Sequence, residues 1–198
     1  RLVGSEMRIR DSCCDPRLVA DDWTGSSAKL EACLELVTEA VAGGHRILLF
    51  SQFTSMLELL AKRLDEAGVS HFTLQGSTPK PVRAEQVRRF NQGEADVFLI
   101  SLRAGGTGLN LTAADIVIHY DPWWNLAAQN QATDRAYRIG QRNPVQVYRL
   151  IAQDTIEEKI VELQQAKQSL ADTVTGGADG AILSMNPEQL LQLLGEEA

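Results

Sequence analysis

A glycine-rich segment at residues 101–110, with the sequence SLRAGGTGLN, has the residue types that can hold a phosphate group. Glycines let backbone N–H groups approach a phosphate closely, because no side chain stands in the way. The segment is not a Walker A loop, because no Gly-Lys-Ser/Thr closes it, and it lacks the third glycine of a dinucleotide fingerprint. A glycine-rich turn of this kind is structural about as often as functional, so its meaning depends on a second motif.

The second motif is QATDRAYRIGQ at residues 131–141. On a helix, Gln131, Arg135 and Arg138 are spaced i, i+4 and i+7 and share one face. Two arginines beside a glutamine can hold a polyphosphate and stabilise the charge on a phosphoryl group in transfer, as arginine fingers do. A solvated arginine face that pairs with Asp134 explains the same spacing equally well. The spacing alone leaves both explanations open.

Strands alternate with helices along the part of the chain that must position these motifs. Short apolar runs predict strands at 46–51, 72–74, 97–101, 116–120 and 145–151. Helices are expected between them: after an N-cap at Ser26-Ser27, from a Ser55/Glu58 capping box to Gly68, at about 80–92 and near 127–138. This alternation predicts an α/β layered domain with a mostly parallel sheet, whose ligands bind at the carboxyl ends of the strands.

The chain is expected to have three parts. Residues 1–25 form a lead-in segment, residues 26–151 form the α/β domain, and residues 152–198 form an appended helical segment. The last part begins at a cap on Asp154 or Thr155 and is interrupted by glycines between Gly176 and Gly180.

Charge is distributed unevenly over the 198 residues. The net charge of −7 belongs to residues 150–198, which hold 2 basic and 9 acidic side chains, whereas residues 1–149 are neutral. The acidity therefore does not exclude a nucleic-acid partner for the middle of the chain. No apolar run is long enough to span a membrane, and three cysteines cannot build a disulfide framework. Residues 1–5 show no long apolar signal core, so secretion is not expected. A soluble, reduced compartment is expected, and no metal site is predicted from the three histidines.

The motifs, in their order along the chain, resemble the second RecA-like lobe of SWI/SNF-type superfamily-two ATPases. The short lobe without insertions resembles the bacterial members more than the eukaryotic remodellers. RILLFSQF at 46–53 resembles motif IV, LISLRAGGTGLNLTAADIVIHYDPWWN at 99–125 resembles motif V and its extension, and QATDRAYRIGQ at 131–141 resembles motif VI. YRLIAQDTIEEKI at 148–160 is similar to the strand and the brace-like helix that close this lobe. The resemblance implies a RecA-like three-layer fold with appended C-terminal helices.

The resemblance also implies site residues. Arg135 and Arg138 would be arginine fingers that reach ATP across a cleft, with Gln131 near the γ-phosphate. Gly106 and Gly108 would shape a loop that faces both nucleotide and DNA. The residues implied to contact the phosphate backbone of one DNA strand are Ser51, Gln52, Ser77, Ser101, Arg103, Thr107 and Asn110. Trp123 and Trp124 suggest base stacking, but the favoured expectation is that one indole packs in the core and the other against the helix of residues 131–141.

The chain contains no Gly-Lys-Ser/Thr loop and no Asp-Glu-x-His motif, so it lacks the lysine and the Mg²⁺ ligands that phosphoryl transfer needs. We expect a motor lobe of an ATP-dependent double-stranded DNA translocase that is inactive as an ATPase by itself. Its implied partners are the first RecA-like lobe of the same protein, DNA and a DNA-bound protein substrate. The expected location is the cytoplasm, at the nucleoid in a bacterium, or the nucleus in a eukaryote. A non-catalytic DNA-binding module and a strand-separating helicase stay open as alternatives.

Overall fold

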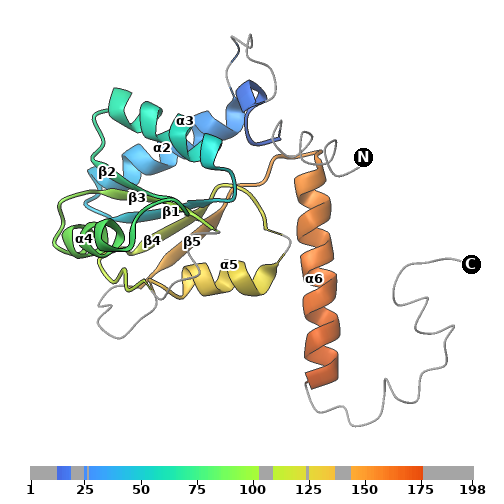
Figure 1. Cartoon of the computed structure of the whole chain (residues 1–198). Helices are drawn as coiled ribbons and strands as arrows, with labels where there is room; N and C mark the ends of the chain where they lie inside the picture. Colours follow the sequence, from blue (N-terminus) through green and yellow to red (C-terminus); the bar gives the residue numbers. More distant parts are fainter. Residues whose placement is uncertain are drawn as a thin grey trace, which may run out of the picture. The chain divides into compact units, whose positions relative to one another are not determined.

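The computed structural model describes residues 13–18, 25, 27–102, 109–123, 125–136 and 144–175. Strands and helices alternate along the chain, except that among the described residues β4 follows β3 with no helix between them (Figure 1). In chain order they are η1 (Pro16–Leu18), α2 (Ala28–Ala42), β1 (Ile47–Ser51), α3 (Thr54–Glu66), β2 (His71–Leu74), α4 (Lys80–Asn91), β3 (Val97–Ser101), β4 (Ile116–His119), α5 (Leu126–Thr133), β5 (Gln146–Arg149) and α6 (Ile156–Thr175).

The five strands form one sheet in the order β2-β3-β1-β4-β5, and every neighbouring pair is parallel. The central strand β1 lies between β3 and β4, with Ser51 opposite Ser101 and Phe50 opposite His119. Strands β1, β3 and β4 are buried along their whole length, which explains why they are continuous apolar runs rather than alternating ones. The predicted α/β fold is therefore confirmed.

Helices cover both faces of this sheet. One core packs α2 and α3 on Leu49 and Leu99, and the other packs α4 and α5 on Phe50 and Phe98. Figure 1 shows the same two layers, with α2 and α3 on one side of the strands and α4 and α5 on the other. Successive strand residues alternate between the two cores, as the pleat of a strand requires.

The helix boundaries follow the expected signals at α2 but not at α3. Ser27 caps α2, because its side chain accepts a hydrogen bond from the backbone N–H of Leu30. The Ser55/Glu58 capping box predicted for α3 is wrong: the helix begins at Thr54, after an N-cap residue, Phe53, that makes no side-chain cap. The hydroxyl of Ser51 accepts from the Phe53 N–H instead, so the preceding strand end supplies the oxygen.

Helix α5 is shorter than its sequence predicts. It ends at Thr133, not near residue 138, and residues 134–136 form a turn. The N–H of Arg135 donates to the carbonyl of Ala132, and that of Ala136 to the carbonyl of Thr133, which is the tighter i to i−3 pattern of a helix end.

The chain divides into two compact units, residues 1–161 and residues 162–198. The predicted division at 151/152 differs from this one by ten residues, because the first turn of α6 belongs to the first unit. No helix in the described ranges has the length and apolarity to cross a bilayer.

Candidate functional site

The carboxyl ends of the parallel strands carry the polar residues of the candidate site. Ser51 ends β1, Ser101 ends β3, and Asp121 lies two residues beyond β4. The residues Arg103, Gly106, Thr107, Gly108, Arg138 and Trp124, all named from the sequence, lie outside the described part of the chain. Those that the structure does place are Ser51, Gln52, Ser77, Ser101, Asn110, Gln131 and Arg135.

Ser51 and Ser101 lie side by side at the sheet edge, but both are buried, with 0% and 2% of their surface exposed. The Ser51 hydroxyl donates to Oδ1 of Asp121 at 2.5 Å. This placement differs from the expectation that both serines touch DNA, because their side chains face the interior. The periodicity of a strand buried on both faces gives no surface position to its last residue.

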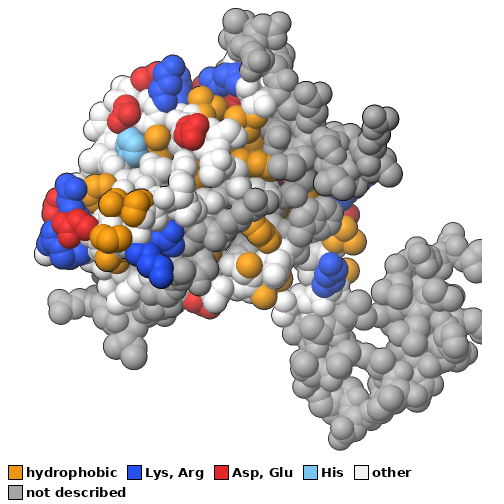
Figure 2. Space-filling model, viewed as in Figure 1, with side chains coloured by type: hydrophobic (Ala, Val, Ile, Leu, Met, Phe, Trp, Pro, Cys, Tyr) orange, Lys and Arg blue, Asp and Glu red, His pale blue; other side chains and the backbone are white. Residues whose placement is uncertain are grey.

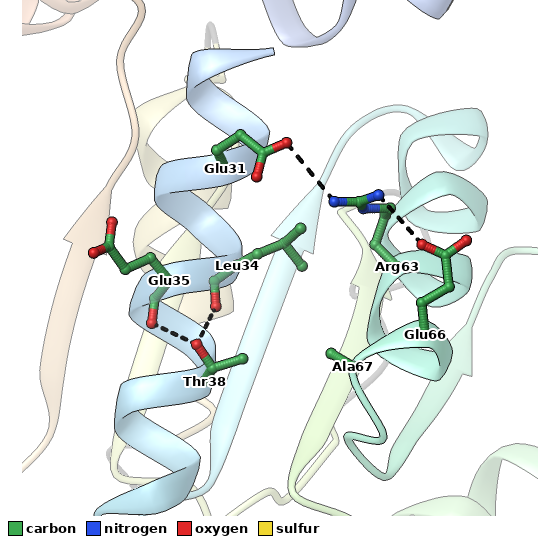
Figure 3. A pocket seen from close by; sticks show the side chains of 7 residues that line it. All are labelled: Glu31, Leu34, Glu35, Thr38, Arg63, Glu66 and Ala67. Carbon is green, nitrogen blue, oxygen red and sulfur yellow. Dashed lines mark hydrogen bonds and ion pairs between the residues drawn. The ribbon is translucent and has the colours of Figure 1, made fainter. Parts of the chain in front are cut away.

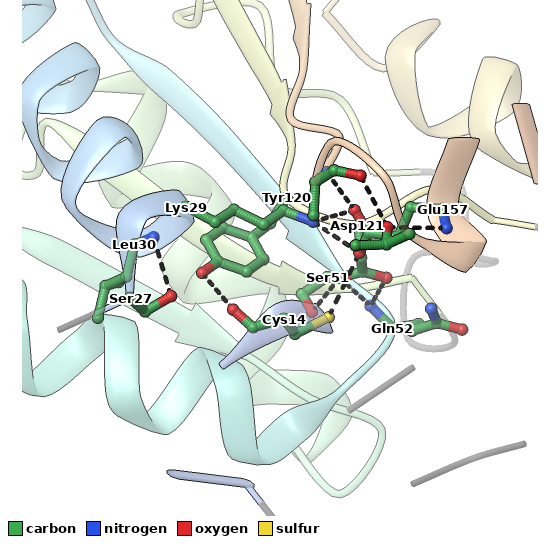
Figure 4. Close-up of polar contacts among 11 residues, drawn as sticks. Cys14, Ser27, Lys29, Leu30, Ser51, Gln52, Tyr120, Asp121 and Glu157 are labelled. Carbon is green, nitrogen blue, oxygen red and sulfur yellow. Dashed lines mark hydrogen bonds and ion pairs between the residues drawn. The ribbon is translucent and has the colours of Figure 1, made fainter. Parts of the chain in front are cut away.

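Asp121 is the centre of a buried polar network that the motifs alone did not single out (Figure 4). Its carboxylate accepts from the Ser51 hydroxyl and from the backbone N–H of Gln52, the latter at 3.3 Å to Oδ1 and 3.2 Å to Oδ2. Burial raises the pKa of Asp121 to about 6, although these hydrogen bonds and the Lys29 charge oppose the rise. An acidic residue just after a predicted buried strand, residues 116–120, was the signal in the sequence.

A buried ion pair lies next to Asp121 (Figure 4). The ammonium of Lys29, in the first turn of α2, lies 2.7 Å and 2.6 Å from the two carboxylate oxygens of Glu157, in the first turn of α6. Glu157 also accepts from the backbone N–H of Ala152 at 2.8 Å. The ammonium lies 5.1 Å from the ring centre of Tyr120, whose hydroxyl donates to the Cys14 carbonyl at 2.9 Å. The network thus joins the lead-in segment, α2, β4 and α6.

Three of the residues predicted to contact DNA lie nearer the surface. Gln52 is half-buried, and Ser77 and Asn110 are exposed. Ser77 lies in a turn in which the Thr78 N–H donates to the Gln75 carbonyl and the Thr78 hydroxyl accepts from the Gln75 N–H. The carbonyl of Asn110 accepts from the Asn91 side chain of α4 at 2.8 Å. These three residues have the exposure that a backbone contact needs.

A backbone hydrogen bond connects the residue after the glycine-rich segment to the second motif. The N–H of Leu111, just after the glycine-rich segment, donates to the carbonyl of Arg135 at 3.3 Å. Gln131 is exposed, whereas only 2% of Arg135 is exposed, so these two side chains do not share one helix face as the spacing predicted. The reason is the end of α5 at Thr133, which removes the regular helical geometry between them.

Buried contacts of His119 in β4 and of Gln129 in α5 hold α5 in place. His119 stacks on Phe50 with ring centres 5.5 Å apart, and its Nε2 lies 2.9 Å from the hydroxyl of Thr133, the last residue of α5. Burial lowers the pKa of His119 to about 4, with Arg149 adding to the effect, so the imidazole is neutral near pH 7. The buried side chain of Gln129 accepts from the Trp123 N–H at 3.2 Å, which holds the β4–α5 connection.

The basic residues of α4 do not form a continuous positive surface. Figure 2 shows blue, red and orange side chains mixed at α4. Arg88 pairs with Glu85 at 2.6 Å, and Arg89 pairs with Glu94 at 2.7 Å. Arg89 also lies over the ring of Phe72. These arginines are largely engaged within the lobe.

A groove of about 560 Å³ lies between α2 and α3 (Figure 3). Arg63 crosses it, 3.7 Å from a carboxylate oxygen of Glu31 and 3.2 Å from one of Glu66. The groove contains none of the residues predicted for the site. Among the described residues, no group of histidine, cysteine and acidic side chains could hold a metal ion.

Residues 28–140, more than half of the chain, match the family described as "Helicase conserved C-terminal domain". The chain is 43% identical over 94% of its length to an "Uncharacterized ATP-dependent helicase" of Mycoplasma pneumoniae, of which it covers 18%. It is 41% identical over 94% of its length to the "Putative ATP-dependent helicase/translocase YwqA" of Bacillus subtilis, of which it covers 21%. It is 46% identical over 84% of its length to the "Chromatin-remodeling ATPase INO80" of Aspergillus terreus, of which it covers 10%.

The fold is also similar to a solved structure, the "C-terminal part of Fun30 ATPase domain". The TM-score is 0.68 at 32% identity, and the match covers 80% of this chain and 54% of that one. The parallel sheet with helices on both faces is RecA-like. The chain spans about a fifth of the length of its bacterial relatives. It belongs to the helicase conserved C-terminal domain family, within the SWI/SNF-type ATP-dependent helicases.

Proposed function

We propose that the chain is the second motor lobe of an ATP-dependent translocase or remodeller that acts on double-stranded DNA. The observation that carries the proposal is the backbone hydrogen bond between Leu111 and Arg135. It joins the glycine-rich segment, implied to face nucleotide and DNA, to the motif implied to face ATP. One lobe with both segments in contact can convert a change at the nucleotide into a change of grip on DNA.

On the nucleotide side, Arg135 and Arg138 act as arginine fingers, with Gln131 beside them near the γ-phosphate and Gly106 and Gly108 shaping the neighbouring loop. Gln131 is already exposed. Arg135 is buried, so its role requires the guanidinium to turn outward when the first lobe closes on ATP. Arginine suits this task because it keeps its charge and donates several hydrogen bonds in a fixed plane.

On the DNA side, Gln52, Ser77 and Asn110, together with Arg103 and Thr107, contact the phosphate backbone of one strand. Such contacts position a protein on DNA without reading its sequence. Ser51 and Ser101 are buried, so they do not contact DNA themselves. Instead they hold the strand ends that carry the contacting residues. The partner on the DNA is a bound protein that translocation displaces.

The first RecA-like lobe of the same protein supplies the rest of the active site. The ligands of the Mg²⁺ that accompanies ATP belong to that lobe in this proposal, because the sequence contains no Asp-Glu-x-His motif. Mg²⁺ would neutralise the charge of the phosphates when bound. The residues of this chain bind and orient the phosphate from the opposite side of the cleft.

The test is DNA-stimulated ATPase activity of a protein that carries both lobes. Arg135→Ala and Arg138→Ala are each expected to lower the stimulated rate by about 10³-fold, the lower end of what arginine fingers contribute. Arg88→Ala is the matched control, because Arg88 is exposed on α4 and pairs with Glu85. Unchanged rates in both finger variants would remove the proposal. A strand-displacement assay distinguishes translocation from strand separation, and we expect no displacement of an annealed strand.

A further inference from the structure

We infer that Asp121 is a positioning residue that fastens the turn at Ser51-Gln52 to the segment that leads into α5. The inference rests on the proposed function, in which this turn faces DNA and α5 faces the phosphate of ATP. Asp121 would make the two faces move as one piece when the lobes close. It touches neither ligand and acts through the residues that do.

The contacts on the β1 side fix both the side chain and the backbone of the turn. The carboxylate accepts hydrogen bonds from the Ser51 hydroxyl at 2.5 Å and from the Gln52 backbone N–H at 3.2 Å. The same Ser51 oxygen accepts a hydrogen bond from the backbone N–H of Phe53 at 3.1 Å, and Phe53 is the N-cap residue of α3. The turn between β1 and α3 is therefore held by one carboxylate and one hydroxyl, in a place where an unsupported loop would be mobile.

The contacts on the α5 side begin two residues further along the chain. The N–H of Trp123 donates to the side chain of Gln129, and the side chain of Asn125 caps α5 by accepting from the Ala128 N–H. A short segment thus runs from Asp121 into the helix that bears Gln131 and precedes Arg135. No long loop intervenes to absorb a displacement.

The charge of the carboxylate strengthens this connection. Hydrogen bonds to an ionised acceptor are shorter and roughly twice as strong as bonds between neutral groups. Asp121 is 1% exposed, so water does not compete for these bonds. Lys29 of α2 and Glu157 of α6 are the charged groups that act on Asp121, the first favouring its ionised form and the second opposing it. Burying a charge costs free energy, so a buried carboxylate with no role beyond packing would be unfavourable. Here the carboxylate fixes the turn through its hydrogen bonds.

The experiment uses Asp121→Asn, Ser51→Ala and the double variant in a protein that carries both lobes. The measured quantity is the DNA concentration that gives half-maximal stimulation of ATPase activity. Each single change is expected to raise it about five- to tenfold, because a charge-assisted bond is replaced by a neutral one or lost. The double variant is expected to match the single variants, because both changes break the same connection.

Asp96→Asn is the matched control. Asp96 also accepts from a serine hydroxyl, that of Ser70 at 2.5 Å, but this pair is exposed and lies at the opposite edge of the sheet. It should leave the half-stimulating DNA concentration unchanged. Urea denaturation of every variant separates a loss of folded protein from a loss of positioning, and Ser51→Ala removes only a hydroxyl.

Two outcomes overturn the inference: a half-stimulating DNA concentration in Asp121→Asn equal to that of the unmodified protein, or additive effects in the double variant. The Arg138→Ala variant, measured in the same assay, separates this failure from failure of the proposed function. If Arg138→Ala abolishes the ATPase while Asp121→Asn behaves normally, only the positioning role of Asp121 is lost. If Arg138→Ala and Arg135→Ala both keep full ATPase activity, the proposed function itself is contradicted.

Discussion

At the scale of single residues, the buried carboxyl of Asp121 links folding to pH. Its carboxyl lies in the interior, where burial raises its pKa from 3.8 to about 6. The ionised form is therefore less favourable in the folded than in the unfolded chain, despite the hydrogen bonds from Ser51 and Gln52. His119 shows the complementary case of a base, since burial lowers its pKa to about 4.

The raised pKa of Asp121 predicts a pH dependence of stability. Between pH 4 and 6 the folded chain holds more protons on Asp121 than the unfolded chain does, so the free energy of unfolding falls as the pH rises. Above about pH 7, one unit beyond the folded-state pKa, the loss is complete and is on the order of 3 kcal/mol, from a pKa difference of about two units. Urea denaturation of the unmodified chain and of Asp121→Asn between about pH 4 and pH 8 measures it.

The quantity to compare is the difference in unfolding free energy between the two proteins at each pH. His119 titrates in the same range but is present in both, so its contribution cancels. The difference, unmodified minus Asp121→Asn, should become smaller from about pH 4 to pH 7 and stay level above that. A difference that is independent of pH would contradict the raised pKa of Asp121.

At the scale of elements, the Lys29–Glu157 ion pair attaches the beginning of α6 to the beginning of α2. Both side chains are almost fully buried. Thr155 and Glu158 shape the same helix start: Thr155 accepts from the Glu157 N–H, and Glu158 accepts from the Asp154 N–H. This first turn of α6 thus belongs to the sheet domain, which explains why the compact unit extends to residue 161.

Removing one member of this ion pair should destabilise the domain more than removing both. Lys29→Met leaves the Glu157 carboxylate buried without its ammonium partner, and the expected loss is about 3–5 kcal/mol. The double variant Lys29→Met/Glu157→Leu should recover most of that loss, because no buried charge is left. Urea denaturation at pH 7 measures all three proteins.

The control for the ion pair is Arg88→Met, which breaks an exposed pair with Glu85 on α4. Solvent screens this pair, so no measurable change in stability is expected. Equal losses in Lys29→Met and in the double variant would show that packing of the lysine stem, not its charge, dominates.

At the scale of the whole molecule, the sheet places the candidate phosphate- and DNA-facing segments along one edge. Parallel strands all end at the same edge, so Ser51, Ser101 and Asp121 come together although they lie 50 and 20 residues apart in the chain. In the motor that we propose, this edge presents one side of the active site, and the residues that activate ATP belong to the other lobe.

This chain by itself is therefore expected to show no ATPase activity. Release of phosphate should stay at the level of a protein-free blank, with or without DNA, because no lysine-bearing phosphate loop is present in the sequence. A protein that carries both lobes serves as the positive control, and circular dichroism verifies that the isolated chain is folded. Hydrolysis by the isolated chain that Arg138→Ala abolishes would contradict the division of the active site between two lobes.

Local patterns in the sequence determined the elements and their order. Continuous apolar runs such as 97–101 identified the buried strands, and Ser27 identified the beginning of α2, because burial on two faces and capping depend on residues close in the chain. The motifs likewise placed the candidate site at the carboxyl edge of the sheet. Their order carried the resemblance to the family that the relatives then established.

Only the tertiary structure decided which polar residues face inward and where helices stop. Ser51 and Ser101 looked like surface contacts but are buried beside each other, and α5 ends at Thr133, before the arginine that the helical spacing had aligned with Gln131. Asp121, Lys29 and Glu157 form one network although they are separated by up to 128 residues. The physical reason is that burial and long-range hydrogen bonding depend on neighbours brought by folding, which no local spacing records.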